Sequence, residues 1–338
     1  MSIKLESPLY KYVVQYIHTK WGSKDYFPGP QPVSIEHRHF PVLKGAEYLV
    51  CEKTDGERYM MVACMFEGKK KCVFVNRAFN MFEVPINLKK SVYDGTILDG
   101  ELYEDTLMVY DAVWVNGESV WNLNLMKRLD AARSIMKSVI YMKSDQYRLK
   151  CKTFHQMREF GKFMDVYLPT VQQKIDGLVF TPVNEPVRIG THETMFKWKP
   201  QEKNTVDFLM KREPSRETPG FKAGTPAWRL YVQEKGKLFF ESELPFNRME
   251  DEPWFEDGAI VECKYVTWEE PMWWKPLKRR TDKNSGLSKG SCHYCGVPRH
   301  SVNESRKEDI NVAAGIGGGW YPYGNNLAKG ATIGYPGR

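Results

Sequence analysis

The segment KTDGER at Lys53–Arg58 holds the residue types most suited to covalent chemistry in this chain. A lysine amine attacks an electrophile only in its neutral form, and burial or a neighbouring positive charge lowers its pKa toward that form. Arg58 can supply that charge, and Gly56 can let the backbone approach a ligand closely. The simpler alternative is a charged hairpin turn, because Asp-Gly favours a two-residue turn.

Further along the chain, charged residues recur beside Asp-Gly or within strands, in DGE at Asp99–Glu101, KIDGLVF at Lys174–Phe180 and FKWKP at Phe196–Pro200. In a strand, Lys197 and Lys199 share one face, and Phe196 and Trp198 share the other. Two ammonium groups on one face repel each other unless an anion lies between them, and a triphosphate is such an anion. Taken singly, each stretch is also compatible with a turn or a solvated strand face.

The elements that must position these residues are mostly short strands. Apolar runs between Tyr48 and Val115 are separated by glycine or charged turns, which predicts an antiparallel sheet. Leu9–Ile17 is amphipathic, Asn124 is expected to cap a helix running to about Lys143, and a second helix is expected over Thr153–Asp165. Strands return at GLVFTP and MFKWKP. The pattern is α+β, without the regular alternation of a doubly wound sheet.

Composition divides the chain into three parts. The polar stretch KPQEKN favours a boundary that makes residues 1–202 one domain. Residues 203–284 contain about five short strands, which suit a small β-barrel of the OB-fold type. Residues 285–338 are rich in glycine and aromatic residues with little aliphatic content, which predicts a flexible C-terminal tail.

Bulk properties narrow the class of protein. The 338 residues carry a net charge of +7, a mild basic bias compatible with an RNA or nucleotide partner. No apolar run approaches the ~20 residues of a membrane span, and the N-terminus lacks the apolar core of a secretory signal. Five of the seven cysteines are scattered among apolar neighbours, as is typical of reduced thiols: Cys51, Cys64, Cys72, Cys151 and Cys263. We therefore expect an intracellular protein of the nucleus or cytoplasm, or a viral protein within its host cell, without a membrane partner.

The ordered set of these motifs resembles the covalent nucleotidyltransferases, which comprise DNA ligases, RNA ligases and mRNA capping enzymes. The series also includes MVYDAV at Met108–Val113. Three features are most similar to the capping branch: FPGPQPVSIE upstream of the lysine, the tryptophan within FKWKP, and RTDK at Arg280–Lys283 after Trp274. The resemblance covers about residues 25–284. It implies a nucleotidyltransferase domain of antiparallel sheets and helices, followed by an OB-fold domain.

The resemblance also implies roles for individual residues. Lys53 would be the nucleophile, Asp176 would be associated with a divalent metal (Mg or Mn), and Tyr110 would stack on the guanine while Lys174 reaches its O6. Other GTP-binding roles would fall to Arg58 and Glu101 at the ribose or around the lysine, Arg77 near the ribose, Lys197 and Lys199 at the α-phosphate, and Arg280, Asp282 and Lys283 at the β- and γ-phosphates.

The implied reaction has two steps. Lys53 attacks GTP, releases pyrophosphate and carries GMP, which then passes to the 5′-diphosphate end of an RNA to give GpppN. Closure of the OB domain would bring Lys283 onto the phosphates. Because the chain carries no triphosphatase or methyltransferase motif, a separate RNA triphosphatase and cap methyltransferase are expected as partners. The alternatives are an ATP-dependent DNA or RNA ligase, and an inactive RNA-binding capping subunit.

Two weaker signals lie toward the C-terminus. SCHYCGVPRH places Cys292 and Cys295 near His300, a pattern that can bind zinc or form a turn with two free thiols. Trp268, Trp273 and Trp274 alternate with basic residues, which fits either an RNA path or packing between domains.

Overall fold

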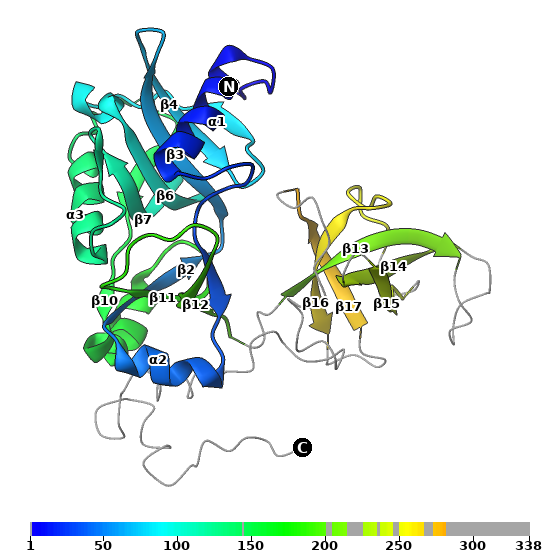
Figure 1. Ribbon diagram of the computed structural model, residues 1–338. Coiled ribbons are helices and arrows are strands. Elements are labelled where there is room, and N and C mark those ends of the chain that lie inside the picture. Colours follow the sequence, from blue (N-terminus) through cyan, green and yellow to red (C-terminus); the bar gives the residue numbers. More distant parts are fainter. Residues whose placement is uncertain are drawn as a thin grey trace. The chain divides into compact units, whose positions relative to one another are not determined.

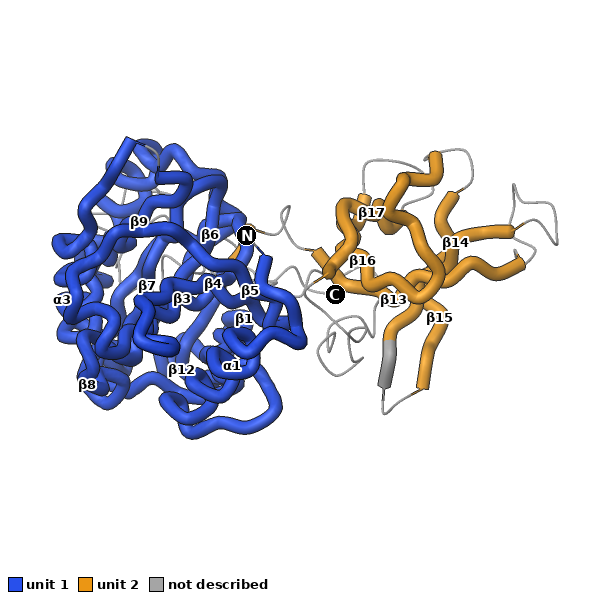
Figure 2. The backbone as a smooth tube through the Cα atoms, turned by 90° about the horizontal axis from the view of Figure 1, so that it is seen from above, with its two compact units in different colours: residues 1–198, 305–338 blue, residues 199–304 orange. Residues whose placement is uncertain are grey.

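The computed structural model describes residues 2–143, 145–200, 205–214, 226–234, 237–245, 250–266 and 273–281. These residues divide into two compact units, the first ending at Trp198 and the second beginning at Lys199 (Figure 2). The predicted positions Asp282, Lys283, Cys292, Cys295 and His300, and the expected tail, lie outside the described residues.

A seven-stranded sheet forms the larger half of the first unit (Figure 1). Its path is β5-β4-β3-β6-β7-β8, with β9 paired to β7. The strands are β3 (Glu57–Phe66), β4 (Lys69–Asn76), β5 (Met81–Glu83), β6 (Thr96–Tyr103), β7 (Thr106–Val115), β8 (Glu118–Ser119) and β9 (Arg148–Cys151). All neighbours in this sheet are antiparallel except β7 and β9. The antiparallel sheet expected between Tyr48 and Val115 is therefore confirmed from Glu57 onward, whereas its first run, Tyr48–Thr54, forms a strand of a second sheet.

A second sheet, here called the β2 sheet, completes the first unit. Its order is β1-β12-β11-β2-β10. The strands are β1 (Gln31–Ser34), β2 (Tyr48–Thr54), β10 (His155–Gln156), β11 (Ile175–Pro182) and β12 (Thr191–Trp198). One face is packed with large apolar side chains, including Phe180, Phe196 and Trp198. This burial leaves the opposite face of β2, β11 and β12 to carry the predicted chemistry.

Two helices cover opposite faces of the seven-stranded sheet (Figure 1). The helix α1 (Pro8–Trp21) begins at Ser7, whose side chain accepts a hydrogen bond from the Tyr10 amide, and ends at Gly22 with φ of 69°. The helix α3 (Leu125–Met136) begins after Asn124, whose Oδ1 accepts from the Lys127 amide at 3.0 Å. The predicted cap is confirmed, although the helix ends before the expected Lys143.

The helix expected over Thr153–Asp165 is wrong in its first part. His155 and Gln156 form β10, and the chain then makes short turns of changing pitch: η3 (Met157–Glu159), α4 (Phe160–Lys162), η4 (Phe163–Tyr167) and η5 (Leu168–Thr170). Phe160 and Phe163 are fully buried against the β2 sheet, so tertiary packing decides the local winding. The remaining short helices are η1 (His37–His39), α2 (Phe40–Gly45) and η2 (Lys90–Asp94).

The second unit is one antiparallel sheet in the order β15-β14-β13-β16-β17. Its strands are β13 (Thr205–Pro214), β14 (Pro226–Glu234), β15 (Lys237–Glu243), β16 (Ile260–Val266) and β17 (Trp273–Arg279). Within the residues that the structure describes, the sheet is open, with β15 and β17 at its edges, and the expected closed barrel is not seen. Trp274 packs in the core of this unit, 4.9 Å from the ring of Phe208.

The segment KTDGER joins the two sheets of the first unit. Lys53 lies near the end of β2, and Arg58 lies near the start of β3. Because these strands belong to different sheets, the hairpin alternative is wrong. A Cβ atom at Gly56 would lie 2.4 Å from the carbonyl oxygen of Leu102 in β6. Glycine is therefore required by the neighbouring backbone, which corrects the expectation that Gly56 makes room for a ligand.

None of the helices among the described residues combines the length and apolar character that crossing a membrane would need.

Candidate active site

Lys53 of β2 and Asp176 of β11 form an ion pair between neighbouring strands in the interior of the β2 sheet. Lys53 Nζ lies 2.9 Å from Asp176 Oδ1, and the side chains are 25% and 12% exposed. In β11, Gly177 pairs with Lys53 and Ile175 pairs with Thr54, so Asp176 is an extra residue at a β-bulge. A bulge turns its extra side chain away from the regular alternation, and here it places a carboxylate beside the predicted nucleophile.

A second contact clamps the two strands next to this bulge. The Asp55 amide donates to the Lys174 carbonyl at 2.8 Å, and Lys174 Nζ lies 2.7 Å from Asp55 Oδ2. The hydrogen bond from Asp55, together with its charge, raises the pKa of the Lys174 ammonium. Lys174 is 72% exposed and engaged with the KTDGER segment itself. Its predicted contact with guanine O6 stays a prediction.

Arg58 is buried behind the nucleophile. Its Nε and Nη2 donate to the two Asp99 oxygens at 3.0 and 2.5 Å, and its Nη1 donates to the Pro30 carbonyl at 2.6 Å. Burial would lower the pKa of the guanidinium, but the Asp99 carboxylate raises it above its ordinary value. The charge of Arg58 is therefore matched by Asp99, so Arg58 is not the uncompensated positive charge that the sequence suggested beside Lys53.

The Pro/Gly-rich segment before β1 forms the cradle around Arg58. A Cβ atom at Gly29 would lie 2.5 Å from Arg58 Nη2, and the Phe27 ring lies 5.3 Å from the guanidinium carbon. The close approach requires glycine at position 29. FPGPQPVSIE thus has a structural role that its composition did not reveal.

Tyr110 also occupies a bulge. In the pairing of β6 with β7, Asp99 faces Asp111 and Gly100 faces Val109, so Tyr110 is the extra residue. Its hydroxyl donates to Asp99 Oδ1 at 2.9 Å. Burial raises the pKa of the Tyr110 phenol, and Asp99 raises it further, so the hydroxyl remains a donor at neutral pH. The predicted stacking of this ring on guanine stays a prediction.

Several positively charged side chains lie near the Glu101 carboxylate. Burial raises its pKa, while the charges of Lys53, Lys152, Arg58 and Arg77 act in the opposite direction. Four positive groups thus lie within electrostatic reach of one side chain. The structure brings Lys53, Arg58 and Arg77 near Glu101, and the nucleotide contacts expected of them stay predictions.

Arg77 is held in a tight loop after β4. The Asn76 side-chain oxygen accepts hydrogen bonds from the amides of Ala78 and Asn80 at 3.1 and 2.9 Å. Phe79 adopts φ of 58°, and its ring lies 5.4 Å from the His18 ring of α1. The loop is therefore fixed from both sides around Arg77.

Lys197 lies on the same face of the β2 sheet as Lys53. Lys197 pairs with Val179, which pairs with Cys51, and residues that face each other across strands point to the same side. Lys53 lies two positions beyond Cys51 and so shares that side. Phe196 and Trp198 are buried on the other face, as predicted, and Lys197 and Lys199 are partly exposed.

Arg280 is anchored within the second unit. Its Nη1 lies 3.0 and 3.1 Å from the two Asp207 oxygens and 3.6 Å from Glu262 Oε2. The guanidinium is 20% exposed, so part of it remains accessible. Its predicted contact with the β- and γ-phosphates stays a prediction.

Lys152 is a buried cation that sequence reasoning missed. Its Nζ donates to the Glu52 carbonyl at 2.7 Å and lies 3.8 Å from Glu52 Oε1, with side-chain exposures of 3% and 0%. Gln173 Nε2 also donates to Glu52 at 3.1 Å. In KCKTF, charged and uncharged residues alternate as they do in a solvent-exposed edge strand. Nothing in this pattern distinguishes the buried Lys152 from an exposed lysine.

Across the described part of the chain, no three His, Cys, Asp or Glu side chains converge to hold a metal ion. A carboxylate beside the partly exposed Lys53, a second carboxylate among cations and a further lysine on the same sheet face form a site suited to a polyanion. The arrangement can bring an amine to a phosphorus atom and stabilise the charge that develops there.

Comparison with known proteins gives consistent results. Residues 7–201 match the family described as mRNA capping enzyme, catalytic domain. The mRNA-capping enzyme subunit alpha of Schizosaccharomyces pombe is 31% identical over 300 residues, which cover 77% of this chain and 73% of that protein. The Saccharomyces cerevisiae protein of the same name is 28% identical over 340 residues, covering 77% and 72%. Among solved structures, a mycobacterial DNA ligase D complexed with ATP and MES matches 76% of this chain and 95% of its own, with 12% identity and a TM-score of 0.40.

Proposed function

The chain belongs to the family of mRNA capping enzyme catalytic domains, and from this membership we propose that Lys53 is the residue that attacks the α-phosphate of GTP. The activity is that of an mRNA guanylyltransferase. The observation that carries the assignment to Lys53 is its position: a partly exposed lysine amine held 2.9 Å from a carboxylate that a β-bulge delivers. The nearby lysines 152 and 174 are respectively buried and held on Asp55.

In the first step, the neutral Lys53 amine forms an N–P bond to the α-phosphorus while the bond to the leaving pyrophosphate breaks. The proton of the ammonium must leave before attack, and Asp176 is the group positioned to accept its hydrogen bond. Asp176 also orients the amine, so that attack can proceed in line with the leaving group. The product is GMP joined to lysine through a phosphoamide.

We propose that Lys197, from its face of the β2 sheet, and Lys199, which follows the end of β12, neutralise the α-phosphate. Glu101 is placed to accept hydrogen bonds from ribose hydroxyls, and Arg77 neutralises phosphate or ribose oxygens close by. Tyr110, held by Asp99, offers its ring to the base. Arg58 contributes by fixing Asp99 and Tyr110 rather than by touching the nucleotide.

The residues present fit a divalent cation such as Mg or Mn. Such ions take oxygen ligands and are commonly held by one or two carboxylates together with substrate phosphates and water. Asp176 supplies a partly exposed carboxylate on the face where the phosphates are proposed to lie. When bound, the ion would offset the negative charge that develops on the phosphate oxygens.

In the second step, the β-phosphate oxygen of a 5′-diphosphate RNA attacks the Lys53-bound GMP, the N–P bond breaks, and GpppN forms. We propose that the second unit is an OB-type domain and that Arg280, Asp282 and Lys283 orient the β- and γ-phosphates in the first step. A separate RNA triphosphatase would produce the diphosphate end, and a methyltransferase would act on the product. Both enzymes would work where transcripts are processed inside the cell.

The test is incubation with α-labelled GTP or ATP, followed by a denaturing gel. We expect a GTP-dependent adduct that is labile in acid and stable in alkali. Lys53→Arg should lower its rate of formation by at least about 10³-fold, because a guanidinium stays protonated and cannot attack. Lys174→Arg is the matched control and should keep the adduct. Labelling by ATP as strong as by GTP would instead indicate a ligase, and an adduct that persists in Lys53→Arg would contradict the assignment of the nucleophile.

A further inference from the structure

The turn between β4 and β5 carries Arg77, one of the cations near the Glu101 carboxylate. Val75 of β4 pairs with Met81 of β5, so residues 76–80 make the whole reversal of the chain. A guanidinium at the end of such a turn is only as well placed as the turn itself. The neighbouring Asn76 determines how well the turn is held.

Asn76 closes the turn with its backbone and its side chain together. Its amide donates to the Asn80 carbonyl at 2.9 Å, and its carbonyl accepts from the Phe79 amide at 3.0 Å. Its Oδ1 accepts from the amides of Ala78 and Asn80 at 3.1 and 2.9 Å. The three amides that follow Arg77 are therefore all bound by this one residue.

The side chain of Asn76 is also anchored outside the turn. Its Nδ2 donates to Glu57 Oε1, in the adjacent strand β3, at 2.8 Å. Burial raises the pKa of the Tyr59 phenol, Glu57 raises it further and Asn76 lowers it, so the phenol lies beside both side chains. Asn76 is 5% exposed. An amide that uses its oxygen and its nitrogen in different hydrogen bonds is held in one orientation.

The turn is strained, and aromatic rings hold it in place. Phe79 has φ of 58°, a conformation that residues other than glycine rarely adopt. Such a residue persists only where its surroundings fix it, and residues of this kind cluster at functional sites. The Phe79 ring lies 5.4 Å from the His18 ring and 6.2 Å from the Phe27 ring. Phe27 also covers Arg58, so the turn packs against the cradle of that residue.

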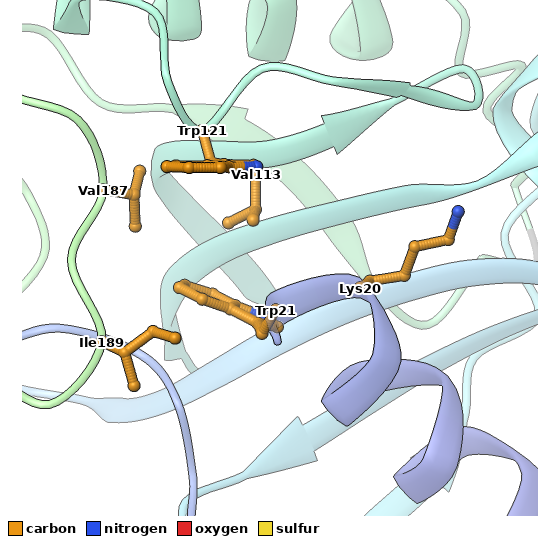
Figure 3. Close-up of a pocket in the computed structure, with 6 residues that line it drawn as sticks. All are labelled: Lys20, Trp21, Val113, Trp121, Val187 and Ile189. Carbon is orange, nitrogen blue, oxygen red and sulfur yellow. The ribbon is translucent and has the colours of Figure 1, made fainter. Parts of the chain in front are cut away.

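The end of α1, which supplies His18, is itself firmly packed. Trp21 belongs to a buried apolar cluster with Val113 and Val187, and these side chains border a small cavity at the end of the helix (Figure 3). The Nδ1 atom of His18 lies 2.9 Å from Ser23 Oγ. The His18 ring therefore has a fixed place against which Phe79 can pack.

We propose that Asn76 is a positioning residue for guanylyl transfer, which holds the Arg77 guanidinium beside Glu101 by closing the turn and anchoring it to Glu57. This role rests on the proposed function, in which Arg77 neutralises phosphate or ribose oxygens of GTP. Asn76 itself does not contact the nucleotide. Its removal should therefore act on GTP in the same way as removal of Arg77.

The test is single-turnover adduct formation by the full chain over a range of GTP concentrations. Partial unfolding alone lowers the amplitude of labelling and leaves the half-saturating GTP concentration unchanged. Arg77→Ala should raise that concentration about tenfold, because a charge-assisted hydrogen bond is lost, and Asn76→Ala should raise it by a similar factor. The double variant should stay within about twofold of Arg77→Ala, because Asn76 acts only through Arg77.

A second set of variants reverses the anchoring hydrogen bond, and it decides the question if Asn76→Ala does not fold. Asn76→Asp keeps the acceptor for the turn amides but sets a carboxylate against Glu57, and should raise half-saturating GTP about fivefold. Adding Glu57→Gln restores a donor and should return the value to within about twofold of the original. Asn116→Ala is the matched control, because Asn116 lies in the β7–β8 turn of the same sheet, is exposed and has φ of 52°. It should leave half-saturating GTP unchanged.

The outcomes separate this role from the proposed function. An unchanged half-saturating GTP concentration in Asn76→Ala, beside a raised one in Arg77→Ala, would overturn the role of Asn76 and leave the proposed function standing. An unchanged value in Arg77→Ala would overturn the role proposed for Arg77, and that of Asn76 with it. Effects that multiply in the double variant, or no recovery when Glu57→Gln is added to Asn76→Asp, would also overturn the proposal.

Discussion

Lys53 and Arg58 belong to one short segment, yet the structure holds their charges in opposite ways. Lys53 makes one ion pair, with a carboxylate at 2.9 Å and both side chains partly exposed. Arg58 makes three hydrogen bonds, two of them to Asp99, with 6% and 1% of the paired side chains exposed. The first pair can open when a phosphate arrives. The second is sealed under the Phe27–Pro32 segment.

This difference fits the roles that we propose, in which Lys53 reacts and Arg58 supports the site. A lysine that must lose a proton and form a bond needs a partner that it can leave. An arginine that positions a tyrosine and a carboxylate benefits from complete burial with every donor matched. The same short segment serves both needs, because the two residues Asp55 and Gly56 connect strands that belong to different sheets.

The largest expected effect on stability comes from breaking the buried Arg58–Asp99 pair, here called the sealed pair. Asp99→Asn leaves the Arg58 guanidinium buried without a compensating charge, and should lower the free energy of unfolding by about 3–5 kcal/mol. Denaturant unfolding followed by circular dichroism measures this. Glu36→Gln removes the partner of Arg38, which is 75% exposed, and serves as a control with little effect. An equally small loss in Asp99→Asn would mean that the pair is not buried as described.

Breaking the Lys53–Asp176 pair should instead have a large effect on the reaction and a small effect on stability. Asp176→Asn should slow single-turnover adduct formation by about 10²-fold, because the amine loses the carboxylate that orients it. Its free energy of unfolding should fall by only about 1 kcal/mol, since one partly solvated interaction is lost. A variant with normal adduct formation but a large loss of stability would show that Asp176 is a structural residue.

Tyr110→Phe tests how much the hydrogen bond from Tyr110 adds to the Arg58–Asp99 pair. The substitution removes the hydroxyl that donates to Asp99 but leaves both Arg58 bonds in place. We expect a loss of about 1 kcal/mol in the free energy of unfolding and a fall of a few-fold in adduct formation at low GTP, because the ring keeps its place less firmly. Equal GTP affinity in Tyr110→Leu and in the original protein would argue against base stacking.

The smallest expected effect concerns Glu101, which lies within reach of both Lys53 and Arg58. Its pKa is raised, so the native state binds this proton more tightly than the unfolded chain does. Stability therefore falls as pH rises from the ordinary glutamate pKa of about 4.5 through the raised value. Glu101→Gln should remove this part of the pH dependence in denaturation measurements from pH 4 to 8. An unchanged profile would show that Glu101 titrates normally.

The same carboxylate should shape the pH dependence of the reaction. If ionised Glu101 accepts hydrogen bonds from ribose hydroxyls, the rate of adduct formation should fall with decreasing pH, and the fall should begin above the ordinary glutamate pKa. Glu101→Gln should react slowly and should not show that fall.

Much of the site could be predicted from the sequence because its chemistry is local in the chain. The motifs KTDGER and KIDGLVF pointed to Lys53 and Asp176. The alternation in FKWKP correctly placed Lys197 on the sheet face opposite to that of Phe196 and Trp198. Strand positions were predictable for a similar reason, since apolar runs bounded by glycine or charge match β2, β3, β4, β6, β7 and the strands from β11 to β16. The short strands β5, β8, β9 and β10 were not predicted. The Asn124 cap was predictable because capping depends on neighbouring residues alone.

The rest depended on contacts between distant segments. The bulges at Asp176 and Tyr110 exist only through strand pairing, and strict alternation would have turned these side chains elsewhere. The pairing of Arg58 with Asp99, the cradle of Gly29 and the burial of Lys152 arise from tertiary packing. The winding after His155 likewise follows from the burial of Phe160 and Phe163, which no local propensity indicates.

The bulge that brings Asp176 to Lys53 also sets when the enzyme can first work. The two residues are 123 positions apart in the chain. At ribosomal rates of 5–20 residues per second, the lysine is made roughly 6–25 seconds before its carboxylate. During translation the proposed nucleophile therefore exists without its partner, and no N-terminal fragment that stops short of β11 can assemble the pair. If Lys53 is the nucleophile, a truncated product without β11 would be inert, and modification by GTP would report that synthesis has passed β11.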